Sequence, residues 1–559
     1  MKKYIKNIFA ALSFMVIATS CGDFGDTNVD PEHLNEDNVD YTMVFTNAQH
    51  QALGSDWDVW RNGMIYLSQW NQHIAAGGWW WSYGVNAYSN GYAASYWGSV
   101  LSGGDRGAVR DIQTVIDLWQ DDEENADNYA MARVIRAYIF QRLTDLHGDI
   151  PYSQAGQPDE YPYPVYDEQE DIYYDLLNEL DEAQEALSSS GTASLGEQEL
   201  FYNGDKTKFR KFANSLMLRV AMRLSKVDAS TAATYAAKAY ANGVIEDTDD
   251  NCLLMHDGGS FTNDSSEPYA KIINYCDPGV AFINETFLNI LQETNDPRIP
   301  LIMCIYPEDY ETADTDPAVA ENAAPELQKG MPGFFSMSTT STYSVLKSVY
   351  AEGDDPLFTE DMLSDSDSDI YYKKTFSQPQ RSTYGDATGP TFVCTAAQTN
   401  LLLAEAAYRG WISGDAEEFY NKGVTCAMEQ FASYPSTNAS TLYSTYLTSS
   451  AISEYLENNP YNSATALEQI NTQYWITCFC DEYESYANWR RSGYPELESR
   501  CSYVPSFSDL NQYDGIVRRF PYPEDELQIN YDNYQDALGR LGLSSESDFN
   551  DTRVWWDVE

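Results

Sequence analysis

Apolar residues recur every three or four positions in several segments of the chain. One series comprises Ile172, Leu176, Leu180, Ala183 and Leu187. A second series comprises Phe209, Phe212, Leu216, Val220 and Leu224. Residues at these intervals share one face of an α-helix, and that face needs a neighbouring helix to cover it. The pattern therefore predicts helices over residues 172–187 and 209–224, and a less regular helix within residues 128–147.

Two further periodic segments, residues 396–411 and 416–431, are separated by a short turn that contains Gly414. Small residues stand where two such helices would cross: Ala404, Ala406 and Gly423. The pair resembles a tetratricopeptide-type helical hairpin, although the full repeat consensus is absent. We expect a mainly α fold of tetratricopeptide-like helix pairs, with long irregular loops such as residues 306–386.

The first residues have the pattern of a secretory signal, in which Lys2, Lys3 and Lys6 precede an apolar run over residues 8–18. That run is roughly half as long as a bilayer-spanning helix requires. Small residues then lead to Cys21 in a sequence that resembles a bacterial lipobox. We expect cleavage before Cys21 and lipid attachment to it. Ordinary cleavage nearby, with Cys21 as a spare thiol, is the alternative.

The composition divides the chain into three expected parts. Residues 1–20 would be the lipoprotein signal peptide. Residues 21–40 are poor in apolar residues and rich in Asp, Asn, Glu and Pro, which predicts a flexible acidic tether. Within it, two acids close to the lipid site resemble a signal that places some Gram-negative lipoproteins on the outer face of the outer membrane: Asp23 and Asp26. Residues 41–559 have a globular composition and would form the folded domain.

The formal net charge of the chain is −53 at pH 7, with 86 Asp and Glu against 33 Lys and Arg. Such a field repels nucleic acid and other polyanions, so we expect no nucleic-acid partner. No apolar run after residue 21 is long enough to span a bilayer. Eight cysteines remain besides Cys21, and their spacing indicates neither a zinc site nor any particular disulfide.

The sequence lacks the motifs of the common catalytic sites. There is no HExxH pair, no GxSxG elbow, no GxxxxGK[ST] loop and no GxGxxG after a strand. The acidic run Asp365, Asp367 and Asp369 begins like a calcium loop, but Ile370 stands where glycine is needed and Phe376 where a bidentate glutamate belongs. We expect no cofactor, with room only for an incidental calcium ion.

Tryptophans are concentrated in one short segment, since seven of the 13 lie between residues 57 and 97. Four of them are expected to pack in the core: Trp57, Trp60, Trp70 and Trp97. The consecutive Trp79, Trp80 and Trp81 cannot all be buried against one surface in a helix or a strand. We expect this triplet, with Tyr83 and with Asn86 as a polar partner, to bind the flat faces of sugars or peptide side chains.

Three segments in order resemble one known family. They read Leu-His-Gly-Asp-Ile-Pro-Tyr over residues 146–152, Ala-Asn-Trp-Arg-Arg-Ser-Gly-Tyr-Pro-Glu-Leu over 487–497, and Arg-Arg-Phe-Pro-Tyr-Pro-Glu-Asp-Glu-Leu-Gln-Ile-Asn over 518–530. With the lipobox and the helical hairpins, they are similar to the SusD/RagB family of outer-membrane nutrient-binding lipoproteins. These motifs read as structural: Asp149 before Ile150 and Pro151 would end a helix, and Arg518 and Arg519 would pair with acids.

The resemblance implies a SusD-like helical domain over residues 41–559 whose irregular loops carry the ligand site. It also implies a partner, a TonB-dependent SusC-like outer-membrane barrel, and no catalytic machinery. We therefore expect a lipid-anchored receptor, facing the exterior of the outer membrane, that passes oligosaccharides or peptides to the barrel. Two alternatives are an envelope-anchored glycoside hydrolase acting before import and a structural lipoprotein that braces a partner.

Overall fold

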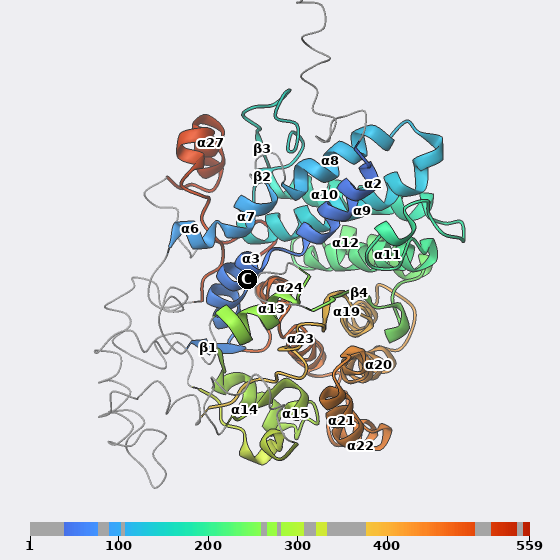
Figure 1. Ribbon diagram of the computed structural model, residues 1–559, viewed down its shortest axis with the longest axis vertical. Coiled ribbons are helices and arrows are strands. Elements are labelled where there is room, and N and C mark those ends of the chain that lie inside the picture. The colour runs from blue at the N-terminus through green and yellow to red at the C-terminus, as the bar shows by residue number, and fades with distance from the viewer. Residues whose placement is uncertain are drawn as a thin grey trace, which may run out of the picture. The chain divides into compact units, whose positions relative to one another are not determined.

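The computed structural model describes residues 39–76, 89–101, 107–258, 265–276, 281–306, 320–331, 376–497, 516–544 and 552–559. Contacts between residues divide the chain into two units, Met1–Val44 and Phe45–Glu559. Nearly all of the described residues belong to the second unit, which consists mainly of α-helices connected by irregular segments (Figure 1). The expected mainly α fold is confirmed.

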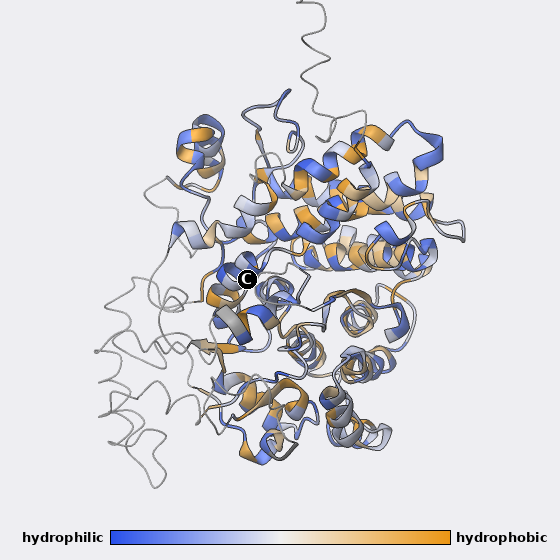
Figure 2. Ribbon diagram, viewed as in Figure 1, coloured by the Kyte–Doolittle hydropathy of each residue, from blue (hydrophilic) through white to orange (hydrophobic). Residues whose placement is uncertain are grey.

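Helices follow one another closely in the first half of the chain. In order they are α2 (Tyr41–Ala52), α3 (Asp56–Asp58), the π-helix η1 (Val59–Leu67), α4 (Ser68–Trp70), α6 (Asn90–Ala93), α7 (Ser95–Val100), α8 (Ala108–Trp119), η4 (Glu123–Asn125), α9 (Ala126–His147), α10 (Gln169–Ala186), η5 (Gly196–Gln198), α11 (Lys206–Arg223), α12 (Ala229–Asn242) and η6 (Thr248–Asp250). Along α8 to α12, apolar and polar residues are interspersed (Figure 2).

The second half is also mostly helical. Its helices are α13 (Pro268–Lys271), the π-helix η7 (Ile272–Cys276), α14 (Glu285–Glu293), α15 (Ile299–Ile302), η9 (Ala320–Ala323), η10 (Pro325–Leu327), α19 (Ala396–Tyr408), α20 (Ala416–Glu429), η11 (Gln430–Ser433), α21 (Thr437–Tyr446), α22 (Ser449–Asn458), α23 (Ala466–Thr477), α24 (Glu482–Ser492), α26 (Glu526–Ile529) and α27 (Tyr531–Arg540).

The described strands are short and form antiparallel pairs. These pairs are β1 (Ile74–Ala76) with β5 (Ala281–Ile283), β2 (Ile150–Pro151) with β3 (Tyr166–Asp167), β4 (Cys252–Met255) with β8 (Pro390–Cys394), and β6 (Met303–Cys304) with β7 (Gln378–Pro379). Each pair joins segments that lie between helices, and strand residues such as Ile150, Cys252 and Phe282 are buried in the core together with the helices.

The helices predicted from periodicity are present, and each packs on the next. α8 packs on α9, α9 on α10, α10 on α11 and α11 on α12 (Figure 1). All five apolar residues of the 172–187 series are buried, and so are all five of the 209–224 series. The 128–147 segment looked less regular because α9 is buried on most of its circumference, which removes the contrast between an apolar and a polar face.

The predicted helical hairpin is α19 and α20. Thr395 and Gln398 form a capping box that begins α19, and the Asp415 carboxylate accepts the Glu417 N–H at the start of α20. A Cβ added at Gly423 would lie 2.8 Å from Cγ of Leu401, so glycine is needed where the two helices approach. The small residue at this crossing point therefore acts as predicted.

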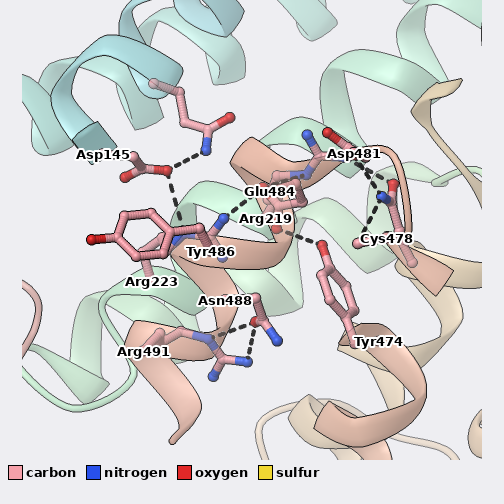
Figure 3. Close-up of polar contacts among 12 residues, drawn as sticks. Asp145, Arg219, Arg223, Tyr474, Cys478, Asp481, Glu484, Tyr486, Asn488 and Arg491 are labelled. Carbon is pink, nitrogen blue, oxygen red and sulfur yellow. Dashed lines mark hydrogen bonds and ion pairs between the residues drawn. The ribbon is translucent and has the colours of Figure 1, made fainter. Parts of the chain in front are cut away.

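A network of buried charges joins α24 to its neighbours (Figure 3). The Arg491 guanidinium donates to both carboxylate oxygens of Glu405 on α19, at 2.7 and 2.8 Å. Arg223 on α11 donates to Glu484 at 2.6 Å, and the Tyr474 hydroxyl on α23 donates to the other Glu484 oxygen at 2.7 Å. The segment 487–497 thus acts structurally, as the sequence suggested, because its arginine anchors α24 in the core.

The other two motif segments also have structural roles. α9 ends at His147, Gly148 follows with φ of +86°, and the Asp149 carboxylate accepts the backbone N–H of Gln169 at the start of α10. Arg518 pairs with the buried carboxylate of Asp557, as predicted. Arg519 donates to the backbone carbonyl of Phe520 at 2.9 Å. The backbone N–H of Phe520 donates to the carbonyl of Leu146 at 2.9 Å, which joins the end of α9 to the C-terminal segments.

Replacing Arg491 with alanine is expected to cost about 3 kcal/mol of unfolding free energy, because the variant leaves Glu405 buried without its bidentate partner. Urea denaturation at neutral pH measures this loss. Lys238→Ala, which removes an exposed ion pair with Asp181, is the control and should cost below about 1 kcal/mol. Equal effects of the two substitutions would contradict the role given to the network.

The same pair should make stability fall in acid. Burial alone would raise the pKa of Glu405, but the guanidinium groups of Arg491 and Arg409 outweigh it and lower the pKa to about 2 from 4.5. Because the pKa of Glu405 is lower in the folded protein than in the unfolded chain, the ionised carboxylate contributes fully to the unfolding free energy above about pH 4.5. This contribution is lost as the pH falls toward 2. The difference in unfolding free energy between the wild type and Arg491→Ala should shrink across that window.

Candidate ligand-binding surface

The residues predicted to bind ligand, Trp79, Trp80, Trp81, Tyr83 and Asn86, lie outside the described residues. The structure does describe both ends of the segment that carries them. Before it, Ala76 of β1 pairs with Ala281 of β5. After it, the chain resumes at residue 89 and continues into α6.

The second end of this segment is attached to a buried tyrosine. The Tyr66 hydroxyl accepts the backbone N–H of Ser89 at 3.0 Å and donates to the Ser89 carbonyl at 3.3 Å. Tyr66 lies on η1, is 1% exposed, and packs edge-on against Phe520. The aromatic core therefore holds the second end at Ser89, and the pairing of β1 with β5 holds the first end at Ala76.

The backbone N–H of Tyr92 donates to the Ser89 carbonyl at 3.1 Å, and Tyr92 belongs to a group that we call the aromatic shelf. The shelf consists of three aromatic residues and one arginine: Trp57, Trp60, Tyr92 and Arg61. The Trp60 ring lies 5.5 Å from Trp57 and 5.5 Å from Tyr92, measured between ring centroids. The Arg61 guanidinium lies 5.2 Å from the Trp57 ring and 5.0 Å from the Tyr92 ring, within cation–π distance of both. The shelf thus connects the exposed indole of Trp57, through Trp60, to Tyr92 and its hydrogen bond with Ser89.

One of the four tryptophans expected in the core is not there. Trp60, Trp70 and Trp97 are buried as predicted, but Trp57 is 48% exposed, so its assignment to the core is wrong. Trp57 belongs to the three-residue helix α3, in which Asp58 faces inward and Trp57 is turned outward. The sequence could not reveal this because a single helical turn carries no readable periodicity.

The carboxyl group of Asp58 sets the position of the shelf. It accepts hydrogen bonds from the hydroxyls of Ser55, Ser95 and Ser99, at 2.8, 2.7 and 2.9 Å. Burial raises the pKa of Asp58, and these hydrogen bonds oppose that rise. The contacts bind α3 to α7 and thereby hold the indole of Trp57 at the surface.

A second candidate region is an internal cleft, defined by the residues that line two adjoining pockets: Glu267, Tyr269, Thr391, Cys480 and Asp481. Tyr384, Tyr434 and Phe479 add aromatic walls to one of these pockets. The cleft combines two carboxyl groups with aromatic rings, and a pair of carboxyl groups is what most glycoside hydrolases use. Its chemistry therefore bears directly on the alternative function.

The carboxyl groups of the internal cleft are engaged within the protein. Glu267 accepts the N–H of Ala270 at 2.7 Å as the cap of α13, and the Thr391 hydroxyl lies 3.2 Å from its other oxygen. Asp481 accepts the side-chain amide of Gln398 at 3.1 Å. Burial raises the pKa of Glu267 to about 8 and that of Asp481 to about 6. Glu267 is thus protonated at neutral pH and serves as a neutral cap.

A histidine completes this buried chain of polar groups. His256 Nε2 lies 2.9 Å from the Thr391 hydroxyl, and burial lowers the pKa of His256 to about 4. The carboxyl of Glu267 and the imidazole of His256 are therefore both neutral at pH 7, linked through one hydroxyl. Within the residues that the structure describes, no group of three or more His, Cys, Asp or Glu side chains could hold a metal ion.

Glu267→Gln should become more stable relative to the wild type as the pH rises from 5 to 9. The folded protein keeps a proton on Glu267 that the unfolded chain releases between about pH 4.5 and 8, so wild-type stability falls across that window. Glutamine preserves the cap and has no such proton. Urea denaturation at both pH values measures the difference, and Glu326→Gln, at an exposed site, is the control. If the difference in unfolding free energy between Glu267→Gln and the wild type did not change with pH, the assignment of Glu267 as a protonated, neutral cap would be contradicted.

Comparisons with known proteins are consistent with this architecture. Residues 38–523 match the SusD-like family described as "Starch-binding associating with outer membrane". No curated protein matches the chain. A solved structure named as a chitin-binding protein superposes with a TM-score of 0.74 at 28% sequence identity, covering 93% of this chain and 100% of that one.

Two further structures share the fold with the same coverage of both chains. One is a SusD-like protein of Bacteroidetes, with a TM-score of 0.74 and 24% identity. The other is a SusD homologue from Bacteroides uniformis, with a TM-score of 0.69 and 22% identity. Since the family match covers most of the sequence, the chain belongs to the SusD-like family of starch-binding proteins that associate with the outer membrane.

Proposed function

We propose that this protein is a non-catalytic receptor that binds oligosaccharides at the outer membrane and passes them to a TonB-dependent SusC-like barrel. The family description, starch-binding, and the chitin-binding relative both favour a glycan over a peptide as ligand. The observation that carries the proposal is the exposed indole of Trp57, whose aromatic shelf reaches Ser89, the fixed second end of the tryptophan-rich segment, through Tyr92. Indole faces stack on the apolar faces of sugar rings.

The proposed binding surface has two parts. Trp79, Trp80, Trp81, Tyr83 and Asn86 would supply the rings and the polar partner predicted from the sequence. The aromatic shelf would extend this surface, since Tyr92 lies on α6, the helix that follows the segment in the sequence. An oligosaccharide has several rings in a row, so adjoining aromatic groups suit it better than a single pocket does.

The proposed location rests on the N-terminal segment. Residues 1–20 would direct export, Cys21 would carry the lipid, and residues 21–40 would tether the domain on the exterior face. In the part of the chain that the structure describes, no helix combines the length and the apolar character needed to cross a bilayer. A lipid on Cys21 would supply the attachment to the membrane.

One observation favours the alternative of a glycoside hydrolase: Glu267 and Asp481 share an aromatic-walled cleft. Two further observations count against it. Both carboxyl groups accept hydrogen bonds from neighbouring protein groups, and Glu267 is 6% exposed. A catalytic acid must reach the glycosidic oxygen of its substrate, which a buried helix cap does not do.

Changing Trp79, Trp80 and Trp81 together to alanine should weaken oligosaccharide binding tenfold or more, because the rings that stack on the sugar are removed. Trp57→Ala should weaken it by a smaller factor of roughly three to ten, or below about 1.4 kcal/mol. Calorimetry with maltose-type and chitin-type oligosaccharides, and with peptides, makes the measurement. Tyr408→Ala, which removes an exposed ring on α19, is the control and should bind normally.

Two results would contradict this proposal. One is unchanged glycan affinity in the triple variant, which would place the ligand elsewhere. The other is steady release of reducing sugar by the purified protein, abolished in Glu267→Gln, which would favour the hydrolase. Since that substitution keeps the cap of α13, a loss of turnover would report on chemistry and not on folding.

Cys21→Ser should move the exported protein from the membrane fraction to the soluble fraction, because the acyl chains would have no site of attachment. Intact mass spectrometry of the wild type should show a chain that begins at Cys21 and carries fatty acyl groups. Cys304→Ser, at a buried cysteine within the domain, is the control and should leave the protein in the membrane fraction. An unmodified thiol at Cys21 would contradict the proposed anchor.

A further inference from the structure

Two buried cysteines face each other across one of the short strand pairs. β4 and β8 are antiparallel, and their register places Cys252 directly opposite Cys394. Side chains at directly opposed positions of an antiparallel pair point to the same face of the ribbon. Both residues are thiols in the structure, at 0% and 2% exposure.

The strand geometry suits a disulfide. Directly opposed residues in antiparallel strands have Cα atoms roughly 4.5 to 5.5 Å apart. Disulfides span Cα separations of roughly 4.4 to 6.8 Å, a range that includes the spacing of directly opposed strand residues. The register shifts between Cys252 and Leu253, and the carbonyl of Val393 beside this irregularity accepts a hydrogen bond from Arg219 at 3.0 Å. Arg219 thus holds the backbone of β8 next to Cys394.

The same burial limits when such a bond can form. Burial raises the pKa of both thiols, and the neighbouring Cys394 adds to the rise at Cys252. A thiol must lose its proton to attack a disulfide, so the folded protein would react slowly. Oxidation would take place while the chain folds, before α11 packs against β8.

We propose that Cys252 and Cys394 form a disulfide in the exported protein. The inference rests on the proposed export, because the cell envelope is oxidising and the cytosol is not. The two thiols lose two protons and two electrons to form one S–S bond, and a disulfide-bearing oxidant accepts them to become two thiols. The bond would connect segments 142 positions apart in the sequence, the difference between 394 and 252.

The cross-link has a structural consequence at the internal cleft. On β4 and just after it, Leu254 and His256 line one of the two pockets. On β8, Thr391 lines both pockets and Phe392 lines one. Joining the two strands at one end would hold these walls at a fixed separation and keep the Glu267 carboxyl enclosed.

Cys304 offers an internal comparison. It is also buried in a two-stranded pair, but the residue opposite it on β7 is Gln378, which cannot form a disulfide. The two sites therefore share burial and strand geometry and differ in whether a second thiol is present. Of these three cysteines, Cys252 and Cys394 should resist alkylation in the unfolded, unreduced protein and Cys304 should not.

The test is differential alkylation of the mature chain, refolded from denaturant with a mixture of oxidised and reduced glutathione. The refolded protein is unfolded again without reductant in N-ethylmaleimide, then reduced, labelled with iodoacetamide and mapped by peptide mass spectrometry. Cys252 and Cys394 should carry the second label, from iodoacetamide, because a disulfide protects them until reduction. Cys304 should carry the first label, from N-ethylmaleimide. In Cys252→Ser, Cys394 should change to the first label, and the unreduced wild type should contain a Cys252–Cys394 cross-linked peptide.

Recovery of Cys252 and Cys394 with the first label would overturn the inference, as would a cross-link to any other cysteine. Because the refolding assay supplies its own oxidant, it does not depend on export. A parallel map of protein taken from the envelope fraction should show the same labels. The refolded protein could contain the cross-link while the cellular protein lacks it and retains its signal peptide. That result would support the strand geometry and contradict the proposed location.

Discussion

Buried pairing of guanidinium and carboxylate groups around α24 is the constraint on which the rest of the structure depends. Glu405 and Arg491 connect α24 to α19, and Glu484 connects it to Arg223 of α11. A charge buried without its partner is costly, so these helices hold one relative arrangement. The network explains why a segment containing two consecutive arginines lies in the core and not at the surface.

The same helix connects this network to the proposed binding surface. Glu482, the first residue of α24, accepts the side-chain amide of Asn71 at 2.6 Å and lies 3.0 Å from Nδ1 of His73. His73 directly precedes β1, whose last residue leads into the tryptophan-rich segment. The core thus fixes the start of the segment that is predicted to bind ligand.

The sequence predicted the framework well because helical faces are periodic. The α10 and α11 series and the α19–α20 hairpin each repeat an apolar position over several turns, which a single sequence reveals. The motif around Arg491 could be recognised, but its partner Glu405 lies 86 positions away and no local pattern connects them. Long-range ion pairs therefore had to come from the structure.

The candidate site was less accessible to sequence reasoning. Trp57 was misplaced in the core because one turn of helix gives no period, and the orientation of α3 depends on the distant hydroxyls of Ser95 and Ser99. The internal cleft was not foreseen at all, since Glu267 and Asp481 are two of 86 acidic residues. Among so many carboxyl groups, only burial and an enclosed position distinguish them.

The most direct test of the central claim is a crystal structure of the protein soaked with the oligosaccharide that binds most tightly. The account predicts an intact glycan whose sugar rings stack on the indoles of residues 79–81 and reach toward the aromatic shelf, with the cleft at Glu267 containing no sugar. A glycan cleaved between Glu267 and Asp481, or one bound far from both aromatic groups, would contradict the receptor described here.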